Sequence, residues 1–385
     1  MNLKRRHALA LAVPGSLLAT SLVAGCKAGI PDTMKIGVIG PLTGPYGARG
    51  KDLLDGAQLA ADDINASGFK ITGKSVKIEI VSLDDKADVE TAKKGAQSLL
   101  DGGVHAVIGP LLTPQAAAVI PVFAAKGIPQ LFTATAAHLN TLGKGNTFRL
   151  QANDALQGRA MAVFSYDNLQ GQRVATVVES GEYGQGLNKA FTEAMKSASK
   201  QVALSIEVDG KADVNPTMAG KIKAARADVV VLFAREPQLR SLFKSLEGVS
   251  YTDVTVLGSN VIRNKNVAAA PVPVRALFAA ATAFDAEEFP AGRAFLNAFF
   301  AKYKSEPVWG AHYAYDAVYA LIDAARRAES LSADKLVAKL KSIDPMTRVN
   351  QQMRFNAEGE LVHSSVAIYK AERGLWAAQM RSSAW

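Results

Sequence analysis

Hydrophobic and polar residues follow two periods along the chain, and these periods predict alternating strands and helices. Short apolar runs at 34–40, 104–109 and 128–133 contain or border glycine and are typical of buried strands. Segment 113–126 has apolar residues at helical spacing, and Gly127 ends it. This order of strand, helix and strand is that of a doubly wound parallel sheet.

The same alternation begins again after Phe148, which predicts a second α/β unit. Its expected elements are strands 173–179, 202–208, 227–233 and 254–257 and helices 154–168, 185–199, 215–225 and 236–247. A strand at 274–283 is expected to cross between the units, and a closing hairpin is expected to turn at Glu358–Gly359. Because 385 residues exceed one comfortable core, the sequence predicts an α/β fold with two doubly wound parallel-sheet lobes.

The first 26 residues have the composition of an export signal. Lys4, Arg5 and Arg6 form a basic start, and the apolar stretch 8–23 that follows is too short and interrupted for a membrane span. The stretch ends Leu-Val-Ala-Gly-Cys, which resembles the bacterial lipobox, and Cys26 is the only cysteine of the chain. We therefore expect a lipoprotein signal peptide at 1–25, lipidation of Cys26 and a tether at 26–33.

The charge pattern argues against nucleic acid as a partner. The formal charge is +9, and without the three basic residues of the signal it is +6. The remaining basic residues are mixed with acidic ones, whereas nucleic-acid-binding proteins concentrate their positive charge on one face. The sequence indicates a mildly basic, solvated surface.

Candidate ligand groups lie where two neighbouring strands of the first unit end. Thr113 and Pro114 begin the helix after strand 104–109, with Thr113 expected at the N-cap, and Thr133, Thr135 and Ala137 follow the next strand. The carboxyl ends of parallel strands form the ligand crevice of such sheets, and a helix N-terminus suits a carboxylate. The alternative is that Thr113 only caps its helix.

No pattern typical of catalysis is present. The loop Gly44–Asp52 has five residues between its outer glycines, where a phosphate loop has four, and Asp52 stands where Ser or Thr should bind magnesium. The histidines show no metal-ligand spacing, and the single cysteine lies at the processing site. We expect a binding protein that is not an enzyme and needs no metal or cofactor.

Six dispersed segments carry a family resemblance. They are IGVIGPLTGPYGARGKDLLDGAQLAADDIN, VKIEIVSLDDKADVETAKKGAQSLL, VHAVIGPLLTPQAAAV, GIPQLFTATA, VVESGEYGQGL and FNAEGELV. In this order they resemble the type I periplasmic binding proteins of the leucine/isoleucine/valine-binding group, the branched-chain amino-acid transport family. The resemblance implies a three-crossing hinge between one lobe of 34–152 plus 283–347 and another of 153–282 plus 348–385.

The resemblance also implies ligand-binding positions. Thr113 matches the hydroxyl residue that holds the ligand's α-carboxylate, and Leu112 matches its neighbour in the wall. The second hydroxyl of the family site falls at Thr135 or Ala137, and a carbonyl of this segment would take the ligand ammonium. Tyr183 matches the aromatic residue that covers the ligand from the second lobe.

Three positions depart from the amino-acid-binding pattern. Arg49 and Arg235 stand where the family has aromatic residues, and Asn260 stands where an acidic residue would pair the ammonium. This change favours a ligand with one or two carboxylates and no required amine. The alternative is that both arginines point to solvent or pair across the closed cleft.

Taken together, the sequence predicts an extracytoplasmic, lipid-anchored solute-binding protein. The expected partners are a small ligand (an amino acid or organic acid), the permease of an ABC transporter, and a membrane that holds the N-terminal lipid. A two-lobed ligand sensor or regulatory envelope lipoprotein without a transport role is the alternative.

Overall fold

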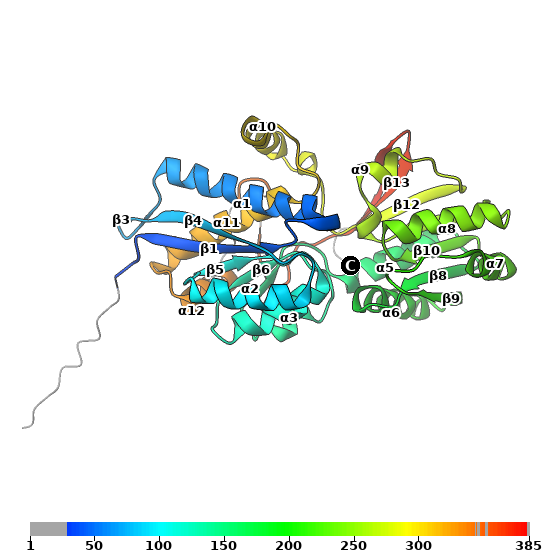
Figure 1. The fold of residues 1–385 in the computed structure, drawn as a ribbon, viewed down its shortest axis with the longest axis horizontal. Coiled ribbons are helices and arrows are strands. Elements are labelled where there is room, and N and C mark those ends of the chain that lie inside the picture. Colours follow the sequence, from blue (N-terminus) through cyan, green and yellow to red (C-terminus); the bar gives the residue numbers. More distant parts are fainter. Residues whose placement is uncertain (1–28, 343, 345–346, 351–352, 383–385) are drawn as a thin grey trace, which may run out of the picture.

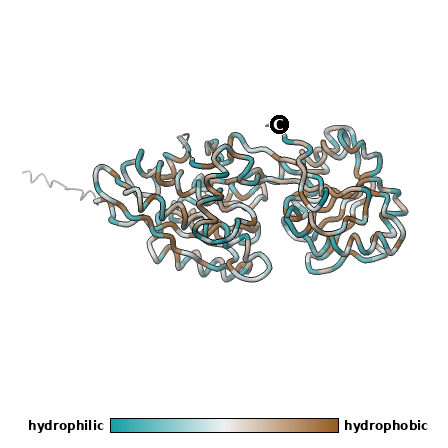
Figure 2. The backbone as a smooth tube through the Cα atoms, turned by 90° about the horizontal axis from the view of Figure 1, so that it is seen from above, coloured by the Kyte–Doolittle hydropathy of each residue, from teal (hydrophilic) through white to brown (hydrophobic). Residues whose placement is uncertain are grey.

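The computed structural model describes residues 29–342, 344, 347–350 and 353–382. The expected signal peptide and Cys26 lie outside these ranges. Within them, no helix is both long and apolar enough to cross a membrane. Figure 1 shows two α/β lobes joined side by side, and Figure 2 shows hydrophobic segments running through the interior of both.

The first lobe is built on a five-stranded sheet of order β4-β1-β5-β6-β7, all parallel. Its strands are β1 (Thr33–Gly40), β4 (Lys77–Asp84), β5 (Ala106–Ile108), β6 (Gln130–Phe132) and β7 (Thr147–Arg149). Its helices are α1 (Gly47–Ser67), α2 (Val89–Asp101), α3 (Thr113–Ala124), α4 (Leu139–Leu142), α10 (Gly292–Tyr303), α11 (Ala311–Ala328) and α12 (Ala333–Ser342). A short hairpin, β2 (Lys70–Ile71) and β3 (Lys74–Ser75), extends beyond α1.

Helices cover both faces of this sheet because its strands are apolar on both faces. Successive side chains of a strand point to opposite faces. Ile36 and Val38 of β1 accordingly pack with α1 and α11, whereas Ile39 packs with α2 and α3. The crossover helices therefore enclose the parallel strands, as the near-continuous hydrophobic runs predict.

The second lobe has a seven-stranded sheet of order β14-β13-β12-β11-β10-β8-β9. Its strands are β8 (Val174–Glu179), β9 (Val202–Val208), β10 (Val229–Phe233), β11 (Thr255–Gly258), β12 (Ala276–Ala281), β13 (Ala367–Glu372) and β14 (Leu375–Arg381). The last two pair antiparallel. Its helices are α5 (Asp154–Val163), which continues as a π-helical turn at Phe164–Asn168, α6 (Glu182–Ser197), α7 (Pro216–Ala224), α8 (Glu236–Gly248) and α9 (Lys265–Ala269).

The third crossing lies later in the chain than the expected boundary at 347/348. Val349, Met353 and Phe355 belong to the core of the first lobe, and the Phe355 ring lies 5.0 Å from that of Phe148. The chain enters the second lobe only near Val366, which packs with the core of that lobe. The apolar residues at 349–355 follow no regular period, so the boundary at 347/348 came from the family resemblance alone.

The chain does turn at Glu358–Gly359, where a hairpin is expected, but the pairing around that turn is limited to an antiparallel bridge between Phe355 and Leu361. The long antiparallel pair is β13–β14, and it turns at Arg373–Gly374. Gly359 instead makes a small turn with φ +82°, and its carbonyl accepts a 2.8 Å hydrogen bond from the Arg149 N–H. A Cβ at this position would lie 1.9 Å from the Thr147 carbonyl oxygen, so only glycine fits this docking of the chain on the edge of β7.

Candidate functional site

A cavity of about 410 Å³ lies between the lobes, at the carboxyl ends of their parallel strands. This volume includes the part that is open to solvent; the space that water-sized molecules can fill is about 40 Å³, well below the roughly 300–1,000 Å³ typical of small-molecule sites. The residues that line it are Arg49, Leu111, Leu112, Thr113, Thr133, Thr135, Gln151, Tyr183, Arg235, Asn260, Val261 and Trp309. Both lobes thus contribute side chains to one cavity that is partly open to solvent.

The first lobe presents hydroxyl groups to the cavity. Leu112 occupies the N-cap position of α3, and Thr113 is the first helical residue, so the prediction that Thr113 caps the helix was wrong. Its hydroxyl, which is not used for capping, lines the cavity beside the free N–H groups of the first turn. The Thr133 hydroxyl is buried and has no hydrogen-bond partner among the described residues. Both hydroxyls are free to donate to a ligand oxygen.

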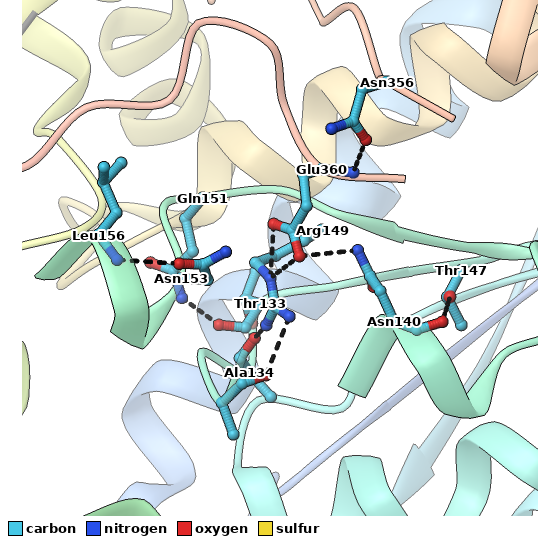
Figure 3. Close-up of polar contacts among 11 residues, drawn as sticks. Thr133, Ala134, Asn140, Thr147, Arg149, Gln151, Asn153, Leu156, Asn356 and Glu360 are labelled. Carbon is cyan, nitrogen blue, oxygen red and sulfur yellow. Dashed lines mark hydrogen bonds and ion pairs between the residues drawn. The ribbon is translucent and has the colours of Figure 1, made fainter. Parts of the chain in front are cut away.

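The backbone carbonyls of 133–136, in contrast, are all occupied from within the protein. Gln151 Nε2 donates to the first of them, and Arg149 Nη1 and Nη2 donate to the second and the fourth. The Asp154 N–H donates to the third at 2.8 Å. Figure 3 shows the side-chain donors converging on this segment. Each carbonyl of this segment therefore already accepts at least one hydrogen bond, which leaves at most one lone pair for a ligand ammonium.

Tyr183 and Asn260 are joined to each other and to the hinge. The Tyr183 hydroxyl donates to Asn260 Oδ1 at 2.7 Å, and Asn260 Nδ2 donates to the Thr282 hydroxyl at 3.2 Å. Thr282 in turn donates to Gln151 Oε1 at 2.9 Å. Burial raises the pKa of Tyr183, so its hydroxyl stays protonated and keeps this donor role. The oxygen of Asn260 is consequently engaged by Tyr183.

Arg235 is paired inside its own lobe. Its Nε and Nη2 lie 3.1 and 3.2 Å from the two carboxylate oxygens of Glu179, at the end of β8. Burial alone would lower the pKa of Arg235. The carboxylate of Glu179 outweighs that effect, so the pKa of Arg235 is raised. The guanidinium also lies 5.5 Å from the ring centroid of Tyr183. Neither expected alternative, exposure to solvent or pairing across the cleft, describes this arrangement.

Arg49 is the cationic group of the cavity that has no carboxylate partner within 4 Å among the described residues. It lies in the first turn of α1, where Nη2 donates to the Val261 carbonyl of the opposite lobe at 3.4 Å. Its guanidinium lies 5.9 Å from the ring centroid of Trp309. Burial lowers the pKa of Arg49. A half-buried guanidinium that is not neutralised favours an anion beside it.

The structure brings most of the expected site residues together. Leu112, Thr113, Thr135, Tyr183, Arg49, Arg235 and Asn260 all line the cavity, whereas Ala137 is exposed and does not. Of the two positions considered for the second hydroxyl, Thr135 is thus the one at the cavity.

Leu111, Gln151, Val261 and Trp309 were not expected at the site. Trp309 precedes α11, and its backbone N–H donates to Asp52 Oδ2 of α1 at 2.5 Å. The sequence signal that could have located Trp309 is Asp52, because an acidic residue on the buried face of a helix needs a hydrogen-bond donor from another segment. Burial raises the pKa of Asp52 to about 6.

Within the part of the chain that the structure describes, no group of three or more His, Cys, Asp or Glu side chains could hold a metal ion. The cavity lining contains none of these residue types. Its donors are two guanidinium groups, hydroxyls and amides, which suit hydrogen bonding to an oxygen-rich ligand.

Comparisons with known proteins agree with this architecture. Residues 33–375 match the periplasmic binding protein family, and the chain belongs to it. The Leu/Ile/Val-binding protein BraC3 of Rhizobium johnstonii is 28% identical over 343 residues, which span 88% of this chain and 92% of that protein. Members of this family are solute-binding proteins rather than enzymes, and so is this chain. Family membership also implies an extracytoplasmic location.

Solved structures show the same fold. The leucine-binding protein LivK of Thermotoga maritima has a TM-score of 0.80 and 21% identity, with 91% of this chain and 99% of that chain covered. A solute-binding protein of an ABC transporter from Rhodopseudomonas palustris BisB5, in complex with 3,4-dihydroxybenzoic acid, has a TM-score of 0.78 and 20% identity, with 92% and 98% covered. These two likenesses establish the type I periplasmic binding protein fold.

Proposed function

We propose that this protein captures a small carboxylate that lacks a charged α-amine and delivers it to an ABC transporter. The single observation that carries the proposal is the distribution of hydrogen-bond donors and acceptors around the cavity. Thr113, Thr133 and Arg49 offer donors, whereas the carbonyls of 133–136 and the oxygen of Asn260 are already engaged. The cavity therefore offers more free donors than free acceptors, which suits an anion better than an ammonium.

The energetic argument depends on what a buried ammonium would lose. A polar group that leaves water without a compensating hydrogen bond costs about 2 kcal/mol or more, and a charged one costs more. At about 1.4 kcal/mol per tenfold, an amino acid should bind at least about 30-fold more weakly than the matching acid without the amine. Among the fold relatives, the protein in complex with 3,4-dihydroxybenzoic acid has a ligand of this amine-free kind.

The transport role and the anchor belong to the same proposal. The relatives include a protein described as the solute-binding protein of an ABC transporter, and closure of two lobes on a ligand would present one shape to a permease. The lipobox-like Leu-Val-Ala-Gly-Cys supports lipidation at Cys26. If so, replacing Cys26 with serine moves the protein from the membrane fraction to the soluble fraction without changing ligand affinity.

Calorimetric titration tests the ligand class on the protein without residues 1–26. Matched pairs isolate the amine: leucine against 4-methylpentanoate and phenylalanine against 3-phenylpropanoate, with benzoate, 3,4-dihydroxybenzoate and succinate added. Mass spectrometry of small molecules that copurify extends the search. We expect binding of at least one amine-free acid and weaker binding of its amino-acid partner. Tight binding of leucine together with failure of every amine-free acid would refute the proposal.

A further inference from the structure

Arg149 is the most buried charged side chain near the site, yet it does not line the cavity. It ends β7 and is 0% exposed. Its guanidinium lies 4.8 Å from the ring centroid of Phe132 at the end of the neighbouring strand β6. Such complete burial of a guanidinium is tolerated only where its donors are satisfied.

Two of its nitrogens hold the cavity segment from behind. Nη1 donates to the Ala134 carbonyl, and Nη2 donates to the Ala136 carbonyl at 2.9 Å. In an extended chain, the carbonyls of residues 134 and 136 point the same way. The side chains of residues 133 and 135 also point the same way as each other. A planar guanidinium that binds both carbonyls fixes the segment extended, with Thr133 and Thr135 facing the cavity.

The third nitrogen connects this segment to the chain just before the last crossing. Arg149 Nε lies 3.0 and 3.2 Å from the two oxygens of Glu360, and Asn140 Nδ2 donates to Glu360 Oε1 at 2.9 Å. Figure 3 shows Arg149 between Glu360 on one side and Ala134 on the other. The charge of the guanidinium is thereby balanced without any ligand.

We propose that Arg149 is a positioning residue that determines ligand specificity without touching the ligand. By donating to the Ala134 and Ala136 carbonyls, it competes for acceptors that an ammonium would need, and it holds the unpartnered Thr133 hydroxyl toward a carboxylate, whereas the Thr135 hydroxyl bonds to Asp154. The direction of the specificity effect rests on the proposed function. The structural part, that Arg149 fixes segment 133–136, does not.

The test uses a double variant and a matched single variant. Arg149→Met with Glu360→Gln removes the guanidinium and the charge that it balances, so no unpaired carboxylate remains. Glu360→Gln alone keeps both carbonyl contacts of Arg149 and also keeps an oxygen for Asn140. Each protein is titrated with 4-methylpentanoate and with leucine, and the ratio of the two dissociation constants is compared. A loss of folded protein lowers the binding stoichiometry for both probes and leaves this ratio unchanged.

A second measurement needs no ligand. Hydrogen exchange is followed by mass spectrometry in peptides that cover 130–140, with β8 (Val174–Glu179) as an internal reference. In the double variant we expect exchange in 130–140 to be at least tenfold faster, with β8 unchanged, and the leucine-to-acid ratio to shift at least tenfold toward leucine. Glu360→Gln leaves the buried guanidinium without its countercharge and should lower the stability of the protein, so exchange in 130–140 should rise no more than in β8, and its leucine-to-acid ratio should stay within about threefold of the native value.

The two proposals fail in different ways. Native protein that prefers leucine refutes the amine-free ligand class, whereas the exchange rates still decide whether Arg149 fixes the segment. Unchanged exchange in 130–140 in a folded double variant overturns the positioning role whatever the native protein binds. Faster exchange with an unchanged ratio overturns the specificity role. Glu360→Gln behaving like the double variant would assign both effects to the carboxylate and also overturn the proposal.

Discussion

The strongest prediction concerns Arg49, the half-buried guanidinium of the cavity without a carboxylate partner within 4 Å among the described residues. Replacing it with methionine keeps an unbranched chain of similar length and removes the charge. A hydrogen bond between a charged group and a ligand contributes about 1.5–3 kcal/mol. At about 1.4 kcal/mol per tenfold, affinity for a carboxylate ligand should fall roughly 10- to 150-fold.

The second arginine of the cavity provides the control. Arg235 is already balanced by Glu179, with contacts of 3.1 and 3.2 Å. The variant Arg235→Met with Glu179→Gln therefore leaves the net charge of the cavity unchanged. Its affinity for the same carboxylate should fall less than tenfold, through lost packing against Tyr183.

Calorimetry with the tightest-binding acid of the panel measures both effects. Thermal unfolding without ligand separates binding from folding, because burial of an unbalanced charge costs stability. Arg49→Met should thus lose affinity with no fall in melting temperature. The reasoning is refuted if Arg49→Met binds the acid within threefold of the native affinity. It is also refuted if the double variant Arg235→Met with Glu179→Gln loses more affinity than Arg49→Met.

Two further predictions concern stability. Burial raises the folded pKa of Asp154 to about 6, against about 3.9 when unfolded, so its stabilising contribution is complete below pH 4 and lost as the pH rises through 6. Asp154→Asn should therefore raise the free energy of unfolding by up to about 3 kcal/mol at pH 8 and not at pH 4, in urea titrations; equal effects at both pH values would contradict this. In α1, a Cβ on Gly56 would lie 1.9 Å from the Ala311 carbonyl oxygen of α11, whereas one on Gly220 in α7 would meet nothing within 4 Å. Gly56→Ala should lower stability by about 1–3 kcal/mol and Gly220→Ala should raise it by up to about 1 kcal/mol; similar melting temperatures would show that the α1–α11 contact adapts.

The alternation of strands and helices was predictable because each parallel strand is apolar on both faces and each crossover helix on one. Runs such as Val229–Phe233 predict a buried strand from local sequence alone. Position within such a repeat then predicts which residues follow a strand end, and local pattern and topology together were enough to place Thr113 and Thr135 near each other. Tyr183 was expected only from the family resemblance.

The rest of the site depends on contacts between segments that are far apart in sequence. Trp309 reaches the cavity because Asp52, more than 250 positions earlier, holds its backbone. Arg235 looked like a free cation until the fold placed Glu179 beside it. No periodicity encodes either pairing. Gly359 does form the expected turn, but its flanks make only one antiparallel bridge because the turn docks on the edge of β7 instead of extending into long strands.

The interleaved lobes also set the order in which the chain can mature. The surface of α1 that contains Ala57 and Ala60 is covered only when α11 packs on it. The edge strand β12 of the second sheet is paired only when β13 is added. Neither half can finish its interior until residues beyond 310 and 367, respectively, have been synthesised. A nascent chain therefore cannot complete either core until these late segments have been made, and until then it leaves apolar surface of both lobes uncovered.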